Sequence, residues 1–305
     1  MKTLVKVELV ILLVCFVSQC YGTYTATYTQ ITSSAARKWL DVSKMADGKI
    51  AVSNTLSNRG KIYTVQFNPL TGGYITGADL TFDVGTSADG LSYNGNTGTE
   101  DQFYVTRNYN VTGVGYGHIE RWGTVSGLST ILYNQGSAIL GIDLINAGDP
   151  SKVVFASQQE VATYDFSTST KTSIIATGST YFSGVSSLGD INADGKLDFV
   201  ASATASSGTG QSDLYTLIST GTSYSLTAIS GTGVGQTIWT GVTNMGDIDG
   251  DGFVELVACK NWRTLSLANE VGLIQTNILV PEPATIGILL TGLLGLRISK
   301  RKKSF

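Results

Sequence analysis

The chain reads DINADGKLD over residues 190–198 and DIDGDGFVE over residues 247–255. Both stretches carry a carboxylate or amide side chain at positions 1, 3, 5 and 9, and a glycine at position 6. Oxygens at alternate positions of a tight loop can converge on one point, and a Ca²⁺ ion takes about six to eight of them. The glycine permits a sharp turn that a Cβ would obstruct. The two stretches therefore predict calcium-binding loops.

Each loop offers side-chain oxygens and one backbone carbonyl to its predicted site. In the first loop the predicted ligands are Asp190, Asn192, Asp194, Asp198 and the carbonyl of Lys196. In the second loop they are Asp247, Asp249, Asp251, Glu255 and the carbonyl of Phe253. Without a cation the crowded carboxylates would repel one another. We therefore expect two Ca²⁺ ions to stabilise the parts of the fold that hold them.

The residues after the loops distinguish them from EF-hands. An EF-hand has a glutamate at position 12 and leads into a helix. Position 12 is Ala201 in the first loop and Ala258 in the second, and the runs 199–202 and 256–259 are largely apolar, as in buried strands. The spacing favours loops that lead into β-strands. The alternative is that Asp and Gly form acidic turns without a metal.

A longer repeat contains the two loops. Residues 181–185 (YFSGV) match residues 238–242 (IWTGV) at the offset of 57 that also separates the loops, 190 to 247. Weaker copies without the ordered carboxylates lie upstream, over residues 140–157, 88–106 and 45–53. Units of roughly 40–57 residues are close to the span of a four-stranded propeller blade.

The remaining body has the pattern of an all-β fold. Short alternating runs such as 61–67 and 213–218 are separated by polar turn residues, and no convincing amphipathic helix interrupts them. We predict a β-propeller of about five four-stranded blades, with the calcium loops in the last two. Seven blades stay open as an alternative, although the chain is short for them. The last unit runs short before residue 280, so we expect the alternating run 24–29 to complete its blade and close the ring.

The segments 186–203 and 243–260 resemble FG-GAP/VCBS-type repeats, the calcium-loop blades of integrin-α-like β-propellers. The resemblance implies a propeller with Ca²⁺ bound in its loops. Members of this family often have seven blades, and this chain is expected to hold about five.

The two ends predict export. Residues 1–22, with a short basic start and the apolar run 9–17, are typical of a secretory signal peptide, which leaves residues 23–279 as the propeller. The tail 280–305 contains Pro-Glu-Pro at 281–283, an apolar stretch over 284–298 and a basic end. This order resembles a PEP-CTERM sorting signal, which implies a Gram-negative bacterium, processing by an exosortase-type enzyme and delivery to the cell surface or exopolysaccharide matrix. The alternative is an ordinary C-terminal membrane anchor formed by 284–298.

The amino-acid composition argues against one class of binding partner. The chain has 20 basic and 23 acidic residues, and seven of the basic residues lie in the two ends, so the body is clearly acidic. An acidic body argues against a nucleic-acid partner. Of the three cysteines, only Cys259 lies outside the signal peptide, so calcium rather than an intramolecular disulfide should brace the fold.

Catalytic patterns are weak. His118 is the single histidine, and the chain offers no nucleophile-elbow sequence and no cluster of zinc ligands. A glycosidase needs two facing carboxylates, and the candidates outside the loops are Glu100, Asp101, Glu120 and Glu160. We therefore expect an exported, calcium-stabilised, noncatalytic binding or scaffold protein, associated with an exopolysaccharide or an envelope protein. The alternatives are a propeller-type polysaccharide lyase or hydrolase, and a structural protein without a specific ligand.

Overall fold

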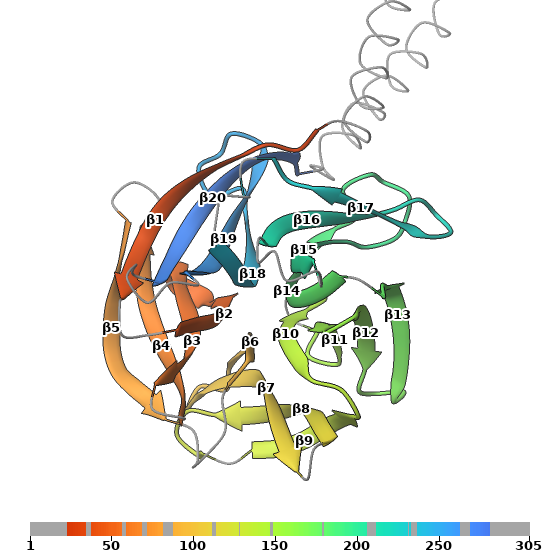
Figure 1. Ribbon diagram of the computed structural model, residues 1–305. Coiled ribbons are helices and arrows are strands. Elements are labelled where there is room, and N and C mark those ends of the chain that lie inside the picture. Colours follow the sequence, from red (N-terminus) through yellow and green to blue (C-terminus); the bar gives the residue numbers. More distant parts are fainter. Residues whose placement is uncertain are drawn as a thin grey trace, which may run out of the picture.

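The computed structural model shows five four-stranded antiparallel sheets arranged around an axis as the blades of a propeller (Figure 1). It describes residues 23–280 except for 35–37, 57–58, 69–71, 82–87, 112–113, 128, 147–148, 179, 206–211, 231, 233–236 and 263–268. The predicted all-β propeller with four-stranded blades is confirmed, and the number of blades is five.

Blades 1 to 4 take their strands in chain order from the axis outward (Figure 1). Blade 1 contains β2 (Lys38–Lys44), β3 (Lys49–Leu56), β4 (Arg59–Asn68) and β5 (Gly72–Thr81), with the 3-10 turn η1 (Ala46–Gly48) after β2. Blade 2 contains β6 (Gly90–Asn96), β7 (Asp101–Val111), β8 (Val114–Gly123) and β9 (Ser129–Gln135). Blade 3 contains β10 (Ile139–Leu144), β11 (Lys152–Ser157), β12 (Glu160–Asp165) and β13 (Thr170–Ala176). Blade 4 contains β14 (Thr180–Gly189), β15 (Asp198–Ala205), β16 (Ser212–Ser219) and β17 (Tyr224–Ala228).

Blade 5 is built from both ends of the described chain. It contains β18 (Thr237–Gly246), β19 (Phe253–Trp262), β20 (Asn269–Leu279) and, as its outer strand, β1 (Ala26–Ser34). β1 pairs with β20 from Ala26↔Thr276 to Ser34↔Asn269. The prediction that the run 24–29 completes the last blade is therefore confirmed.

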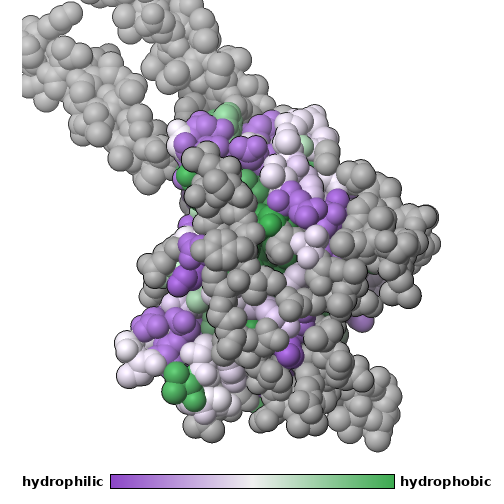
Figure 2. All heavy atoms as spheres, turned by 90° about the vertical axis from the view of Figure 1, so that its left-hand side faces the viewer, coloured by the Kyte–Doolittle hydropathy of each residue, from purple (hydrophilic) through white to green (hydrophobic). Residues whose placement is uncertain are grey.

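The apolar residues are buried between the blades. Each of the five hydrophobic clusters joins residues of two neighbouring blades, so every blade packs on both of its faces. The second strand of a blade accordingly reads as a continuous apolar run: β11 is buried after its first residue, whereas the outer strand β13 is exposed or half-buried. Among the coloured residues in Figure 2, hydrophilic and neutral ones predominate on the outer side that includes blade 1.

At the axis, glycines let the inner strands approach one another. A Cβ on Gly141 of β10 would lie 2.6 Å from the Cα of Gly184 in β14, and a Cβ on Gly184 would lie 2.7 Å from the Cα of Gly241 in β18. Gly90 of β6 is in the same relation to Gly141, with 3.0 Å between the added Cβ and its Cα. Blade 1 has Asp41 at this position, next to Gly241. Backbone therefore meets backbone around most of the ring.

Two residues after each of these positions lies a side chain that accepts a hydrogen bond from the following blade. The N–H groups of Tyr93, Leu144 and Asn244 donate to the hydroxyls of Ser43 (2.8 Å), Ser92 (3.0 Å) and Ser186 (2.9 Å), respectively. The N–H of Ser187 donates to Asp143, and that of Lys44 donates to Thr243 (3.4 Å). These five bonds connect blade 1 to 2, 2 to 3, 3 to 4, 4 to 5 and 5 to 1, so they form a closed ring.

Two carboxyl groups depart from the regular pattern at the axis. Asp41 stands where the other blades have a glycine, and Asp143 stands where they have a hydroxyl. Asp41 is buried and accepts hydrogen bonds from the N–H groups of Val42 (2.9 Å), Leu91 (2.9 Å) and Ile142 (3.5 Å), which belong to three blades. Burial raises the pKa of Asp41 well above its usual value, despite these donors. Asp143 replaces the hydroxyl that the other blades carry in the ring, and burial raises its pKa to about 6.

We predict that replacing an axial glycine is costly. In Gly184→Ala the new methyl group would meet the Gly241 backbone, and such overpacking costs about 1–3 kcal/mol of unfolding free energy. The matched control is Gly178→Ala, because a Cβ on Gly178 meets no atom within 4 Å. The control should be neutral or stabilising by up to about 1 kcal/mol. Urea unfolding of both variants checks this, and equal stabilities would contradict the close approach at the axis.

The change Asp143→Ser should act in a pH-dependent way. The pKa of Asp143 is about 6 in the folded protein, compared with an ordinary value of 3.8. The folded state therefore holds more protons between these values, and its stability falls as the pH rises through this window. Serine does not titrate, so the Tm of the variant minus that of the unaltered protein should increase from pH 4 to pH 7. The same difference at both values would show that Asp143 does not titrate differently on folding.

Candidate metal centre

The second acidic loop brings three carboxylates together. It connects β18 to β19 in blade 5, and one carboxylate oxygen from each of Asp247, Asp249 and Glu255 lies within 4.8 Å of the other two. Among the described residues, this is the group of three His, Cys, Asp or Glu side chains close enough to share one ion. An all-carboxylate set is typical of a site for a hard cation such as Ca²⁺.

Backbone N–H groups of the loop hold its acidic side chains in place. The carboxylate of Asp247 accepts hydrogen bonds from the N–H groups of Gly250 (2.7 Å) and Gly252 (2.9 Å). Both glycines have positive φ angles, +83° and +88°, in which a side chain would be strained. Asp251 accepts from the N–H of Phe253 (2.9 Å). The predicted role of Gly252 as the turning residue agrees with its φ angle.

Glu255 is the side chain that points most directly to a ligand. It is 1% exposed, and its Oε2 accepts a hydrogen bond from the N–H of Ile248 (2.8 Å). Its Oε1 is buried and has no hydrogen-bond partner, which is costly for a carboxylate oxygen. Burial, together with the nearby carboxylates Asp249, Asp251 and Asp247, raises the pKa of Glu255 to about 6. A cation among Asp247, Asp249 and Glu255 would satisfy Oε1 and neutralise this crowding, so the residues fit a calcium ion.

One contact of this centre has no signal in the loop sequence. The side-chain Nε2 of Gln275, in β20, donates to Oδ2 of Asp249 (3.3 Å). Gln275 lies 20 residues after the loop, and only the pairing Glu255↔Gln275 between β19 and β20 brings it near. A pattern search along the chain therefore misses it.

The first acidic loop, between β14 and β15, has the same outline with different contacts. Both oxygens of Asp198 are used by the backbone, since Oδ1 accepts from the N–H of Ser219 (2.7 Å) and Oδ2 from the N–H of Ile191 (2.9 Å). Asp190 accepts from the N–H groups of Asp194 (3.0 Å) and Gly195 (2.8 Å). The amide of Asn192 donates to the carbonyl of Ser219 (2.7 Å). Metal binding by this loop stays a prediction, as do the carbonyl ligands Lys196 and Phe253.

Strand register identifies the counterparts of Asp198 and Glu255 in the other blades. Each inner strand has one residue whose N–H donates to the hydrogen-bond ring, and the counterpart immediately precedes the residue that pairs with this donor. For the donors Lys44, Tyr93 and Leu144, the counterparts are Lys49, Gln102 and Lys152, respectively. Blades 1 and 3 thus carry a lysine where blades 4 and 5 carry a carboxylate. An ammonium group supplies positive charge at that position without a metal.

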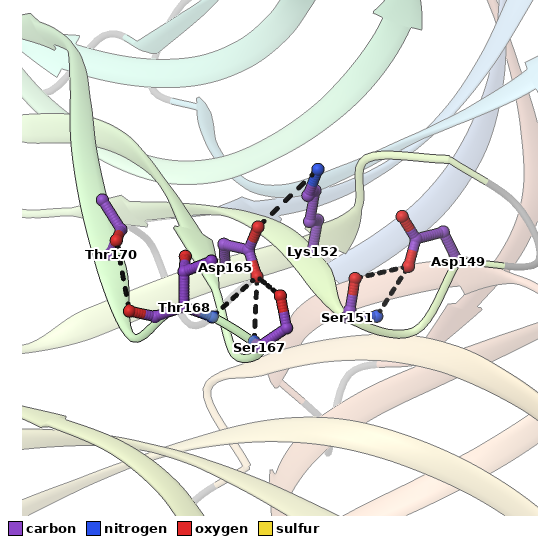
Figure 3. A network of polar contacts seen from close by, with 7 residues as sticks. All are labelled: Asp149, Ser151, Lys152, Asp165, Ser167, Thr168 and Thr170. Atoms are coloured by element: carbon purple, nitrogen blue, oxygen red, sulfur yellow. Dashed lines mark hydrogen bonds and ion pairs between the residues drawn. The ribbon is translucent and has the colours of Figure 1, made fainter.

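Figure 3 shows how blade 3 uses its lysine. Nζ of Lys152 lies 3.6 Å from Oδ2 of Asp165, whose other oxygen accepts from the hydroxyl (2.5 Å) and N–H (2.8 Å) of Ser167. Asp149 accepts from the hydroxyl (2.6 Å) and N–H (3.0 Å) of Ser151. These hydrogen bonds lower the pKa of both carboxyl groups, in contrast to the raised pKa of Glu255. Asp149 and Asp165 are therefore matched by donors of the protein itself.

Each of the catalytic candidates makes its own polar contacts. Their partners are the N–H of Ser126 for Glu100, the hydroxyl of Tyr93 for Asp101, Arg107 for Glu120 (3.2 Å) and Lys171 for Glu160 (2.6 Å). His118 is half-buried on β8. Cys259 is fully buried, and burial raises the pKa of its thiol well above the usual value, as in an inert core cysteine.

The described residues include no helix that is long and apolar enough to span a membrane. The predicted signal peptide and the predicted apolar stretch 284–298 lie outside the described part of the chain.

Comparisons with known proteins support the repeat. The family model for an FG-GAP-like repeat matches residues 190–258, a range that contains both acidic loops. The comparison with curated proteins gave no match.

Structural comparison finds solved proteins that have low sequence identity to this chain. An exo-β-1,3-galactanase from Phanerochaete chrysosporium matches at 10% identity and a TM-score of 0.49, over 82% of this chain and 64% of its own. An endo-arabinase from Bacteroides thetaiotaomicron matches at 11% identity and a TM-score of 0.49, over 83% of this chain and 99% of its own. A chain of a nidogen/laminin complex matches at 13% identity and a TM-score of 0.43, over 69% of this chain and 74% of its own. The chain thus carries an FG-GAP-like repeat within a five-bladed β-propeller.

Proposed function

We propose that the protein is an exported, calcium-stabilised propeller that binds or scaffolds at a cell surface or in an extracellular matrix without catalysing a reaction. The observation that carries the calcium part is the buried, unpartnered Oε1 of Glu255 among the carboxylates of its loop. A second ion in the loop 190–198 is part of the proposal and rests on the shared sequence pattern.

The surface location and the partners rest on the two ends of the sequence. The signal-like residues 1–22 and the PEP-CTERM-like tail 280–305 support export from a Gram-negative bacterium and processing by an exosortase-type enzyme. An exopolysaccharide or an envelope protein is then the partner that the propeller meets. Two of the candidate carboxylates, Glu120 and Glu160, support a binding role over catalysis, because they form ion pairs with Arg107 and Lys171.

Calcium should raise the thermal stability of the protein, and Glu255 should carry much of the effect. For a Kd of roughly 10⁻⁴ M, as in extracellular calcium modules, 10 mM Ca²⁺ would stabilise the folded state by about 2.7 kcal/mol per site. Glu255→Gln keeps the acceptor for the Ile248 N–H and removes a buried charge. This variant should lose the blade 5 response, yet be at least as stable as the unaltered protein in chelator.

The matched control is Glu160→Gln, a carboxylate paired with Lys171 away from both loops. It should keep the full calcium response in differential scanning calorimetry. Titration calorimetry should count two ions for the unaltered protein and one for Glu255→Gln. An unaltered protein without a calcium response would refute the proposed metal sites.

If the protein binds without catalysing a reaction, it should retain its ligand and release no reaction products. Immobilised protein in Ca²⁺ should retain matrix polysaccharide or an envelope protein from a surface extract, and soluble protein should release no reducing ends or unsaturated products from a polysaccharide panel. Product formation that Glu120→Gln abolishes would instead support the lyase or hydrolase alternative. A protein that retains nothing from either source would contradict the binding role.

A further inference from the structure

The end of β20 lies between the candidate metal loop and the N-terminal segment of the chain. Residues 275–280 run beside the loop on one side and beside residues 23–27 on the other. Gln275, Thr276 and Val280 contact the loop, whereas Asn277 contacts the N-terminal residues. This segment is therefore the physical connection between the metal centre and the strand that closes the ring.

On the side of the loop, three hydrogen bonds hold the segment. Nε2 of Gln275 donates to Asp249, one of the three clustered carboxylates (3.3 Å). The hydroxyl of Thr276 donates to the carbonyl of Val254, directly before Glu255 (2.6 Å). The N–H of Val280 donates to the carbonyl of Gly252, the turning residue of the loop (3.0 Å).

On the other side, Asn277 binds the start of the chain body. Its Oδ1 accepts from the N–H of Thr25 (2.8 Å), its N–H donates to the carbonyl of Thr25 (3.3 Å), and its Nδ2 donates to the carbonyl of Thr23 (3.3 Å). The ladder continues with Ala26↔Thr276 and Thr27↔Gln275. The residues that contact the loop are thus paired directly with β1.

The shape of this segment depends on the loop. The register jumps from Glu255↔Gln275 to Phe253↔Leu279, so residues 276–278 bulge opposite Val254. A bulge bends its strand and leaves residues outside the regular ladder. Here the Thr276 hydroxyl stabilises the bend, because it binds the Val254 carbonyl and accepts from the N–H of Ile278 (3.1 Å). Movement of Val254 and Glu255 would therefore move the residues to which β1 is paired.

Apart from its ladder with β20, β1 is held at separate points. It is the outer strand of its blade, and its side chains from Ala26 to Gln30 are exposed or half-buried. Ile31 is buried in the cluster between blades 5 and 1, and the N–H of Ala26 donates to the carbonyl of Ser230 (2.9 Å). Tyr28 is an anchor, with its ring 4.5 Å from Nζ of Lys260 and its hydroxyl bonded to Glu270 (2.8 Å). Outer strands with few buried contacts open at lower free energy than the core of a domain.

We infer that cation binding at Asp247, Asp249 and Glu255 controls the docking of β1 on β20, so that calcium closes the propeller ring. This inference rests on the calcium site proposed above. Removing the cation leaves mutually repelling carboxylates beside Gly252, Val254 and Gln275, and the segment 275–280 passes this disturbance to β1. Coupling between two sites is reciprocal, so docking of β1 must in turn strengthen cation binding.

Hydrogen–deuterium exchange of the whole protein tests the inference. Calcium should slow amide exchange in β1 and in the end of β20 by roughly 5–150-fold, the usual range for coupled sites. Strands β11 and β12 of blade 3 serve as the internal control and should change little. Glu255→Gln should abolish the calcium effect on β1. Asp190→Asn, in the loop of blade 4, should leave it intact because the hydrogen bonds of that loop go to β16 and its following turn.

A second variant separates the connection from the metal site. Thr276→Val keeps the side-chain shape and all carboxylates, and removes the hydrogen bond to Val254. It should still bind Ca²⁺ by titration calorimetry, whereas the calcium effect on β1 exchange should shrink. Asn277→Ala, which contacts no carboxylate of the centre, should lower the calcium affinity through the reciprocal coupling.

The outcomes distinguish the two claims. A protein that binds no Ca²⁺ would overturn both the proposed site and this inference. A protein that binds Ca²⁺ and gains protection in the loop 247–255, with unchanged exchange in β1, would overturn the inference alone. Calcium-dependent protection of β1 that is lost in Glu255→Gln and reduced in Thr276→Val would support both.

Discussion

Around the axis, neighbouring inner strands come so close that backbone meets backbone, with a hypothetical Cβ on Gly141 only 2.6 Å from the Cα of Gly184. This approach allows a side-chain oxygen two residues later in each inner strand to accept an N–H from the next blade. The five interblade clusters then bury the apolar residues that the blades present to their neighbours. The ring thus depends on close backbone contacts at its axis and on apolar packing between its blades.

The blades differ at one position near the start of their second strands. Blades 1 and 3 place Lys49 and Lys152 where blades 4 and 5 place Asp198 and Glu255. Lysine brings its own positive charge, as its contact with Asp165 shows in blade 3. In blade 5 the buried Glu255 instead keeps one oxygen without a hydrogen-bond partner, beside the carboxylates of Asp247 and Asp249. Blade 3 therefore pairs its carboxylate with a lysine of the chain, whereas blade 5 gathers carboxylates in an arrangement that could hold a cation.

Local pattern was enough to predict much of this architecture. The loops 190–198 and 247–255, the repeat around them and the alternating run 24–29 predicted the propeller and its closing strand, because turn chemistry and strand alternation are written in neighbouring residues. The pairing Glu255↔Gln275 and the substitution of Asp41 for an axial glycine were not predicted, since they depend on strand register and on contacts between blades. The two similar loops also differ in a way that sequence does not reveal. Asp198 finds two backbone donors, whereas the longer Glu255 leaves one oxygen unpartnered.

The position of β20 inside blade 5 also has a mechanical consequence. β20 lies between β19 and β1, with a ladder of hydrogen bonds on each side. In antiparallel pairs these bonds lie perpendicular to the strands. A force applied to Val280 along the axis of β20 would therefore shear both ladders at once and would not peel one edge open bond by bond. The strand that ends the described body is thus placed to bear tension, and load reaches the rest of the ring through two neighbours.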